Sequence, residues 1–429
     1  MKNIKIALLG LGNVGSGVWK IFNANKEEIV KRSGYNIEIS KVLVRNIDKP
    51  RLVDVPKELL TTDYNEILSN DDIKIVVELM GGIEPAKEYI IKAMRSKKHI
   101  VTANKMLLAI QGDELYEIAD EEGVGLNYEA SVAGGIPIIA GINESLTANK
   151  IESLYGIING TTNYILTKMQ FEGASFEDAL KEAQEKGYAE ADPTSDVEGY
   201  DAQYKLSILA SLAFGTKINT ENVYREGISN ITKSDIDCAN QFGYVIKLLG
   251  IIKEVEGELE LRVHPTMIPK RHPLANVHDS FNAVFVRGNA VGDLMFYGKG
   301  AGDLPTGSAV VSDIISILRN NISLEAEGLV TKNNLWVRET RSFDEIKSKY
   351  YMMISVEDKI GVLGTVTNVF GKSNVNVKSI AQREVENNFI TLVLTTHETK
   401  EESISKAIES LEKLEEICTV HNVIRIEDF

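Results

Sequence analysis

Two residues of opposite charge, Asp201 and Lys205, begin a segment that is mostly apolar from Leu206 onward. Their four-residue spacing places them on one face of a helix. An acid and an amine held out of bulk water can bind a polar ligand and exchange a proton with it, because burial and a neighbouring charge tune both groups. The alternative is a surface ion pair worth roughly 0.3–0.5 kcal/mol, which on the residues alone is the more frequent arrangement.

A glycine-rich turn, Gly-x-Gly-x-x-Gly, follows the apolar run at residues 4–9 and precedes a helical segment that we expect to extend to about Lys31. In this context the first glycine permits a tight turn, the second lets the backbone approach a pyrophosphate, and the third lets the helix pack on the strand. The first N–H groups of the helix would favour the phosphates. An ordinary βα turn is the less favoured alternative. The candidate cofactor-binding residues of this turn are Gly10, Leu11, Gly12, Asn13, Val14 and Gly15.

Two basic residues are further candidates for contact with a nicotinamide dinucleotide. Arg45 ends the second expected strand, where an acid would bind the ribose hydroxyls of NAD and a guanidinium could instead bind the 2′-phosphate of NADP. Lys105 follows the fourth expected strand, and ligands of such sheets lie beyond the carboxyl ends of the strands. We therefore expect NADP or NAD, with NADP favoured; a solvated Arg45 near Asp48 is the alternative.

Short apolar strands alternate with helices in the first part of the chain. The strands are expected at 4–9, 36–45 and 73–79, with a fourth strand and its exit loop at 99–105. This alternation predicts an α/β fold with a Rossmann-type doubly wound parallel sheet. We assign residues 1–135 to this dinucleotide-binding domain and expect a helix at 303–320 to return to it.

A mixed α/β domain for substrate binding and dimerisation is expected at 136–302. It should contain strands at 150–160, 251–263 and 281–290, and helices at 163–171, 175–187, 200–214 and 234–249. His264 and His272 are expected in loops bordering this domain, because their spacing matches no metal-ligand pattern. Residues 321–347 are expected to form a linker. The last segment, 348–429, has the element order β-α-β-β-α-β of a ferredoxin-like module.

The net charge and composition of the chain limit the kinds of binding partner that we expect. The chain of 429 residues has a formal net charge of −15 and two cysteines, Cys238 and Cys418. An acidic protein is a poor default partner for nucleic acid or an anionic membrane, no apolar stretch is long enough to span a bilayer, and two distant cysteines give no disulfide framework. We expect a cytoplasmic protein that acts on a small molecule, with neither nucleic acid nor membrane as a partner.

Six motifs within residues 10–314 resemble those of homoserine dehydrogenases: "GLGNVG", "TANK", "EASVAGGIPII", "NGTTNYIL", "KGYAEADPTSDVEGYDAQYKL" and "GKGAGDLPTGSAVVSDI". That family interconverts L-homoserine and L-aspartate 4-semialdehyde with NAD(P), in threonine and methionine biosynthesis. The resemblance implies that Lys105 and Lys205 transfer protons and that Asp201 binds or orients the substrate beside Lys205. It also implies substrate contacts from Glu190, Gly160, Thr161 and Thr162, and cofactor contacts from Lys105, Gly187 and Gly302.

The same resemblance implies a monovalent cation, expected to be sodium, on the carbonyl groups of Glu129, Val132, Gly134 and Ile136. Hard cations prefer oxygen ligands, and a Gly-rich loop can direct several carbonyls at one point. A tight hinge without a cation is the alternative, and any cation is expected to be structural.

The C-terminal module, residues 350–429, resembles an ACT domain, a small amino-acid-sensing unit, through "VEDKIGVLGTVTNVFGKSNVNVKSI" and its strand order. The likeness implies an effector near residues 358–363, hypothesised to be threonine, and a homodimer or higher homo-oligomer. The alternative is a module that only promotes association.

Two other functions are weighed against this reading. An aspartate-semialdehyde dehydrogenase needs a nucleophilic cysteine, and Cys238 lies in a plain helical segment without a supporting histidine. A regulator that binds nucleotide and amino acid without catalysis would lack the charged segment that holds Glu190, Asp201 and Lys205. Both alternatives are disfavoured, and we expect an enzyme.

Overall fold

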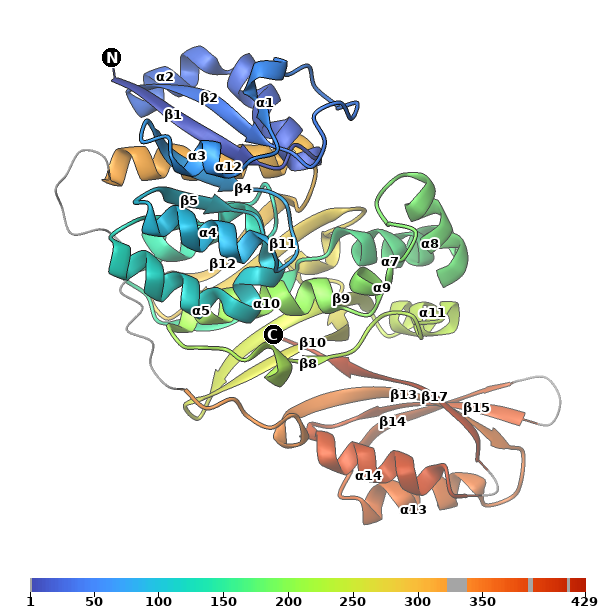
Figure 1. The fold of residues 1–429 in the computed structure, drawn as a ribbon. Coiled ribbons are helices and arrows are strands. Elements are labelled where there is room, and N and C mark those ends of the chain that lie inside the picture. The colour runs from blue at the N-terminus through green and yellow to red at the C-terminus, as the bar shows by residue number, and fades with distance from the viewer. Residues whose placement is uncertain (1, 322–337, 385–388, 415–416) are drawn as a thin grey trace. The chain divides into compact units, whose positions relative to one another are not determined.

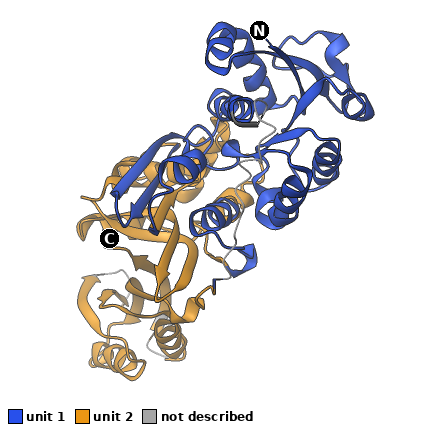
Figure 2. Cartoon of the chain, turned by 90° about the vertical axis from the view of Figure 1, so that its left-hand side faces the viewer, with its two compact units in different colours: residues 1–152, 203–222, 281–338 blue, residues 153–202, 223–280, 339–429 orange. Residues whose placement is uncertain are grey.

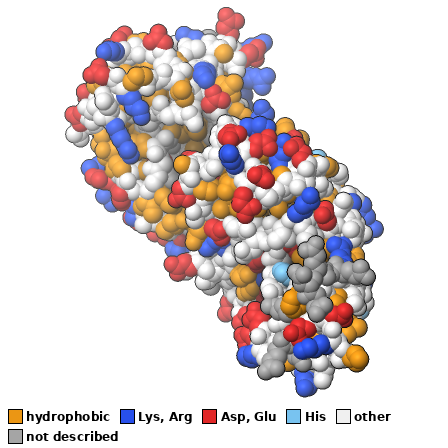
Figure 3. Space-filling view, turned by 90° about the vertical axis from the view of Figure 1, so that its right-hand side faces the viewer, with side chains coloured by type: hydrophobic (Ala, Val, Ile, Leu, Met, Phe, Trp, Pro, Cys, Tyr) orange, Lys and Arg blue, Asp and Glu red, His pale blue; other side chains and the backbone are white. Residues whose placement is uncertain are grey.

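The structure is a computed structural model that describes residues 2–321, 338–384, 389–414 and 417–429. It divides into two compact units, which Figure 2 shows in different colours. Unit 1 comprises 1–152, 203–222 and 281–338, and unit 2 comprises 153–202, 223–280 and 339–429. No helix of the described ranges is long and apolar enough to cross a membrane. On the face drawn in Figure 3, acidic and basic side chains are interspersed, so their charges partly offset one another there.

The framework of unit 1 is a parallel sheet. Its strands are β1 (Lys2–Leu9), β2 (Tyr35–Leu43), β3 (Leu60–Thr61), β4 (Ile73–Glu78), β5 (His99–Thr102) and β6 (Leu126–Asn127). They follow the order β3-β2-β1-β4-β5-β6 (Figure 1), and each neighbouring pair is parallel. The accompanying helices are α1 (Asn13–Ala24), α2 (Lys26–Ser33), α3 (Asn65–Leu68), α4 (Ala86–Arg95), α5 (Lys105–Glu122) and α12 (Asp303–Asn321). The Rossmann-type sheet predicted from the alternation is therefore confirmed.

Strand β1 is apolar throughout its second half because helices cover both of its faces. Ile6 and Leu8 join one core with residues of α1 and α12. Ala7 and Leu9 join a second core with residues of α4 and α5. All four side chains are fully buried. Successive residues of a strand point to opposite faces, so a central strand of this fold needs an uninterrupted apolar run.

Helices α1 and α12 approach each other at glycines. A Cβ atom on Gly17 would lie 1.9 Å from the carbonyl oxygen of Asp303, and one on Gly307 would lie 2.9 Å from the backbone of Gly17. Larger residues could not maintain this contact. The expectation of one helix to about Lys31 was wrong, because α1 ends before Asn25 and a separate helix, α2, follows. Asn favours such breaks, since its side chain competes for backbone hydrogen bonds.

An antiparallel hairpin of β11 (Phe281–Gly288) and β12 (Gly292–Lys299) also belongs to unit 1. The first strand matches the strand expected at 281–290. The second was missed because its side chains are exposed or only half-buried and give little apolar signal.

Unit 2 contains a long hairpin where the sequence suggested a helix. Strand β9 (Tyr244–Val255) pairs with β10 (Glu258–Pro269) across a two-residue turn at Glu256 and Gly257. Both turn residues have positive φ angles, which suits the twist of a tight hairpin. The helix expected at 234–249 is α11 (Lys233–Gln241), which ends earlier than expected, and the single strand expected at 251–263 is two strands joined by this turn. The error arose at 244–249, because a continuous apolar run does not distinguish a buried strand from a buried helix.

The helices of unit 2 lie close to their expected positions. They are α7 (Gly160–Glu172), α8 (Phe176–Glu185), α9 (Thr194–Val197) and α11 (Lys233–Gln241), together with the start of α10 (Tyr200–Phe214). The boundary between the units falls within α10, after Ala202. Strand β7 (Ile151–Ile157) leads into α7, and the short strand β8 (Tyr224–Arg225) pairs in parallel with β10.

The C-terminal part of unit 2 has the predicted ferredoxin-like order. Its elements are β13 (Lys347–Glu357), α13 (Val362–Lys372), β14 (Val377–Glu384), β15 (Phe389–Thr396), α14 (Glu401–Leu411) and β17 (Ile417–Ile426), with the short β16 (Thr399–Lys400) beside β13. The strands follow the order β17-β13-β15-β14, and β17 also pairs with β10. Most of the expected linker, residues 322–337, lies outside the described residues; Arg341 within it pairs with Glu258.

Candidate active site

The glycine turn after β1 is as tight as its sequence requires. Gly10 has a φ angle of +104°, and a Cβ atom there would lie 2.9 Å from the carbonyl oxygen of Leu79. A Cβ atom on Gly15 would lie 2.6 Å from the oxygen of Gly10. Gly12 caps α1 and has open space where a side chain would be. The turn therefore leaves a bare backbone and a helix N-terminus at the carboxyl end of β1, the arrangement that accommodates phosphates.

A buried acid that the sequence analysis missed, Glu78, organises the carboxyl ends of β4 and β5. Its carboxylate accepts hydrogen bonds from the N–H groups of Met80 and Gly81, at 2.7 and 3.1 Å, and from the Thr102 hydroxyl at 2.7 Å. Lys105 is the first residue of α5, after this cluster, and is half-buried. Its position at the end of β5 is the one expected for a residue facing a ligand.

Arg45 lies two residues beyond β2 and is exposed. The loop that follows curls around Arg51, whose guanidinium donates to the carbonyl oxygens of Asn46 and Ile47 at 2.5 and 2.8 Å. A cavity of about 510 Å³ is lined by residues 47–55, Lys57 and Leu60. The exposure of Arg45 is consistent with the alternative of a solvated side chain. A cavity nevertheless opens in the loop that directly follows it.

The loop expected to hold a cation is strongly curved. Ala133 and Gly134 have successive φ angles of +53° and +45°. No described backbone N–H donates to the carbonyl groups of Val132 or Gly134, and the carbonyl group of Glu129 accepts only a long hydrogen bond of 3.4 Å from Val132. The carbonyl oxygen of Ile136 accepts from Ile138 at 2.8 Å. Three of the four expected carbonyls are therefore available, or nearly so, for a further ligand.

Two buried acids lie beside this loop. The Glu129 carboxylate accepts from the N–H groups of Ile139 and Ala140 at 2.9 and 2.8 Å, and the N–H of Glu129 donates to Asp313 at 2.8 Å. Burial raises the pKa of Glu129 above its ordinary value, and burial together with Glu129 raises the pKa of Asp313 well above its own. The loop therefore lies in a poorly solvated environment beside two acids whose charged forms are disfavoured by burial.

In unit 2, Asn159 connects three segments of the expected substrate site, and the sequence analysis missed it. Its side-chain nitrogen donates to Asp196 at 2.7 Å and to Asp201 at 2.9 Å. Its side-chain oxygen accepts from the N–H of Thr162 at 2.8 Å and so caps α7. An Asn immediately before the start of a helix is a recognisable capping signal. That local signal does not reveal the hydrogen bonds to Asp196 and Asp201, which are distant in the sequence.

The loop 187–193 is joined to the same helix. The Thr161 hydroxyl donates to the carbonyl oxygen of Tyr188 at 2.7 Å, and the side chain of Gln184 donates to the carbonyl oxygen of Glu190 at 3.0 Å. Gly187 has a φ angle of +75°, and Glu190 is exposed. The structure thus joins Thr162 and Asp201 through Asn159, and joins Thr161 to the loop that holds Gly187 and Glu190.

Asp201 and Lys205 are buried, with 2% and 8% of their surfaces exposed. They lie one turn apart on α10, whose later positions Leu206, Leu209 and Ala210 are fully buried. The alternative of a solvated surface ion pair is therefore wrong for this pair. Burying charge is costly unless the groups are paired or used, so this turn is a strong candidate for a chemical role.

Gly187 lies in unit 2, and the other expected cofactor residues lie in unit 1. These are the glycine turn, Arg45, Lys105 and Gly302, with Lys205 also assigned to this unit. Gly302, with a φ angle of +128°, directly precedes α12, and Asp303 pairs with Lys20 of α1 at 2.7 Å. Gly302 is thereby held near the helix that the glycine turn begins.

The two histidines do not form a metal site. His264 is fully buried within β10, so its expected placement in a loop was wrong; burial and nearby arginines hold its pKa well below the ordinary value. His272 caps the short helix at residues 273–276. Among the described residues, no group of three or more His, Cys, Asp or Glu side chains could hold a metal ion.

A parallel sheet with a bare glycine turn after its first strand binds dinucleotides. A buried acid and amine on one helix can accept and return the proton that accompanies hydride transfer at a hydroxyl-bearing carbon. The class of protein defined by this fold and these residues is an NAD(P)-dependent oxidoreductase.

Comparison with known proteins gives the family. Residues 137–315 match the family described as homoserine dehydrogenase, 10–129 match its NAD-binding domain, and 350–416 match the ACT domain. The chain belongs to the homoserine dehydrogenase family, and its enzymatic role lies in amino-acid biosynthesis.

Two individual relatives match the whole chain in sequence, and a third matches part of it. The homoserine dehydrogenase of Bacillus subtilis (strain 168) is 43% identical over 429 residues, covering 100% of this chain and 99% of that protein. A homoserine dehydrogenase structure from Thiobacillus denitrificans is 43% identical with a TM-score of 0.94, covering 100% of this chain and 99% of that one. A hyperthermophilic archaeal homoserine dehydrogenase in complex with NADPH is 27% identical with a TM-score of 0.63, covering 73% of this chain and 97% of that one.

Proposed function

We propose that the protein interconverts L-homoserine and L-aspartate 4-semialdehyde by hydride transfer, with Lys105 and Lys205 assisting the proton transfer. The observation that carries the proposal is the buried turn of α10, with Asp201 and Lys205 at 2% and 8% exposure. A carbonyl oxygen gains negative charge as hydride arrives, and an ammonium group beside it stabilises that charge and supplies the proton.

The substrate is a zwitterion and needs partners for both of its charges. Asp201 is held in one orientation by Asn159, at 2.9 Å, and this hydrogen bond prepares the carboxylate to orient the substrate beside Lys205. Glu190 supplies a second acid for the substrate ammonium group. Gly160, Thr161 and Thr162 at the N-terminus of α7 would line the substrate pocket. The N–H groups of Gly160 and Thr161 favour a carboxylate there, whereas that of Thr162 donates to Asn159.

The nicotinamide dinucleotide supplies the hydride, and the chain supplies its binding site. The glycine turn at Gly10–Gly15 fits a pyrophosphate through the open backbone at Gly12. Lys105, Gly187 and Gly302 would contact the cofactor. NADP is the preferred form in this proposal, because Arg45 occupies the place of the acid that binds NAD, and because a related archaeal enzyme is known in complex with NADPH.

A monovalent cation, expected to be sodium, fits the loop of Glu129, Val132, Gly134 and Ile136. The support for it is the curvature of the loop, the available carbonyl groups and the two buried acids nearby. Its role would be structural, to hold this loop in shape.

The ACT domain is proposed to bind an amino-acid effector, with threonine as the hypothesis, since threonine is made downstream of homoserine. A homodimer or higher homo-oligomer and a cytoplasmic location also stay predictions. The threonine hypothesis is tested by titrating threonine into the assay, where the full chain should lose activity and a chain ending at about residue 345 should not respond.

The catalytic proposal is tested by following the absorbance of the reduced nicotinamide with homoserine and NADP. The wild type should turn over, and Asp201→Asn should lose at least about tenfold in kcat/KM for homoserine while still binding NADP. A non-catalytic regulator is the competing function. Cofactor binding without turnover by the wild type, in either direction of the reaction, would favour the regulator.

A further inference from the structure

We infer that Arg425, in the last strand of the ACT domain, is a positioning residue for the substrate acid Asp201, acting through Glu226 and Arg225. The inference rests on the proposed function of Asp201. All of the residues involved belong to unit 2.

Arg425 joins the ACT domain to the segment around β8. Its guanidinium forms hydrogen bonds with Glu401 at the start of α14, at 2.9 and 2.6 Å, and with Glu226 at 2.7 Å. Arg425 is 5% exposed, and Tyr350 donates to Glu401 at 2.7 Å. A planar guanidinium shared by two acids holds both in a defined geometry, which a lysine could not reproduce.

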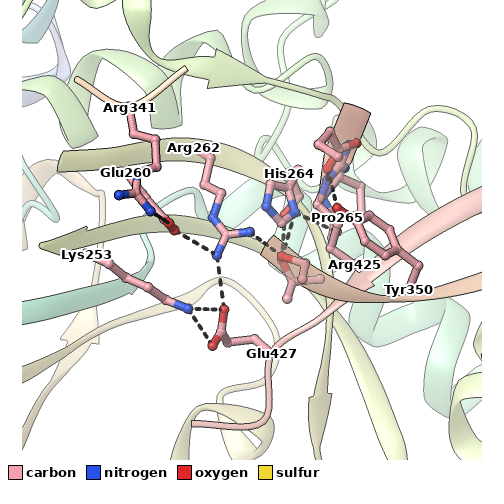
Figure 4. Close-up of polar contacts among 12 residues, drawn as sticks. Lys253, Glu260, Arg262, His264, Pro265, Arg341, Tyr350, Arg425 and Glu427 are labelled. Carbon is pink, nitrogen blue, oxygen red and sulfur yellow. Dashed lines mark hydrogen bonds and ion pairs between the residues drawn. The ribbon is translucent and has the colours of Figure 1, made fainter. Parts of the chain in front are cut away.

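The C-terminal strand is held at a second point nearby, shown in Figure 4. Glu427 accepts from Lys253 at 2.7 Å and from Arg262 at 3.3 Å, and Arg262 also donates to Ser348 at 2.9 Å. The chain is thus held here by two clusters: Arg425 joins β17 to Glu226 and Glu401, and Glu427, directly after β17, joins Lys253 and Arg262. Of these described contacts, those of Arg425 reach the segment beside the start of α10.

Strand β8 and the residue that follows it connect Arg425 with the start of α10. Glu226 directly follows β8, and Tyr224 within β8 accepts a hydrogen bond from Arg425 at 3.3 Å. Neighbouring residues of a strand point to opposite faces, so Arg225 points away from Tyr224. The Arg225 guanidinium lies 3.5 Å from the centroid of the Tyr200 ring and donates to the carbonyl oxygen of Glu198. Tyr200 begins α10 and directly precedes Asp201.

The turn before α10 rests directly on this segment. The N–H of Ile228 donates to the carbonyl oxygen of Val197 at 2.8 Å. A Cβ atom on Gly227 would lie 2.4 Å from that same oxygen, so the two stretches of backbone touch. Gly199, with a φ angle of +80°, completes the turn. A shift of residues 225–228 would therefore displace the turn at 197–199 that leads into Asp201, because close-packed backbones cannot move independently.

The test compares Arg425→Gln and Glu226→Gln with Arg341→Gln as the matched control. Arg341 also joins the C-terminal part of the chain to β10, through Glu258 at 2.8 Å, and among the described residues its ion pairs go to Glu256, Glu258 and Glu260 rather than to 223–228. We expect Arg425→Gln and Glu226→Gln each to raise KM for homoserine or lower kcat by roughly tenfold, with the Kd for NADP unchanged. The double variant should lose no more than the worse single variant, since both act on one link.

If Arg425→Gln does not fold, Glu226→Gln still tests the inference. The Glu226 side chain is 37% exposed, so the loss of its charge should be better tolerated. Arg425→Lys should restore only part of the activity lost in Arg425→Gln. Homoserine kinetics for Glu226→Gln that match those of Arg341→Gln would overturn the inference. A wild type inactive with homoserine would instead overturn the proposed function, and the inference with it.

Discussion

Replacing Asn159 by Ser separates the hydrogen bonds that Asn159 donates to Asp196 and Asp201 from its role as a helix cap. Serine is a good helix cap, so the bond to the N–H of Thr162 should be kept. The side-chain amide that donates to Asp196 at 2.7 Å and to Asp201 at 2.9 Å is lost. A hydrogen bond to a charged group contributes about 1.5–3 kcal/mol. If that energy is felt in the transition state, kcat/KM for homoserine should fall by roughly 10- to 150-fold.

The assay is the steady-state oxidation of homoserine, together with urea unfolding of each variant. Asn159→Ala removes the cap as well, and should lose about a further 1 kcal/mol of unfolding free energy compared with Asn159→Ser. Ser175→Ala is the matched control, because Ser175 caps α8 in the same unit and accepts from the N–H of Asp178 at 3.1 Å. It should lose stability but keep kcat/KM. Wild-type kcat/KM in Asn159→Ser would refute the reasoning.

Three further predictions address other parts of the chain. Burial lowers the pKa of Lys247 from 10.5 to about 7; the unfolded chain therefore binds a proton in this pH range that the folded chain does not, and the unfolding free energy should rise with pH between these values. Lys247→Met should reduce that rise by about 4 kcal/mol, measured by urea unfolding at several pH values, and an unchanged pH dependence would contradict it. Gly17→Ala should destabilise the protein by about 1–3 kcal/mol through the contact with α12, whereas Gly364→Ala, which has open space in α13, should not, as thermal unfolding would show. Arg45→Asp should lower the ratio of kcat/KM for NADP over NAD by about tenfold or more, and an unchanged ratio would remove Arg45 from cofactor selection.

Local patterns in the sequence were sufficient to predict the elements that have a clear apolar pattern or glycine spacing. Strand β1, the glycine turn and helix α10 follow from runs of apolar residues and from glycine spacing, and the structure contains all three. The two errors at α11 and β9 share one cause. Residues 245–252 are all buried and, apart from Lys247 and Gly250, apolar, so the segment lacks the periodicity that separates strand from helix.

The contacts that organise the site were beyond the reach of local patterns. Asn159 meets Asp196 and Asp201 across 37 and 42 residues of chain, and Arg425 meets Glu226 across 199 residues. No spacing rule links residues so far apart. Burial was equally invisible in the sequence, and burial is what separates the Asp201 and Lys205 pair from an ordinary surface ion pair.

The most direct test of the central claim is kcat/KM for homoserine in Lys205→Met, beside Lys217→Met. Lys217 is an exposed lysine that pairs with Asp113 at 2.8 Å, so its loss should leave turnover unchanged. Loss of a group that stabilises developing charge and supplies a proton should lower kcat by about a hundredfold or more, with NADP affinity retained. Turnover by Lys205→Met at the rate of Lys217→Met would contradict the account.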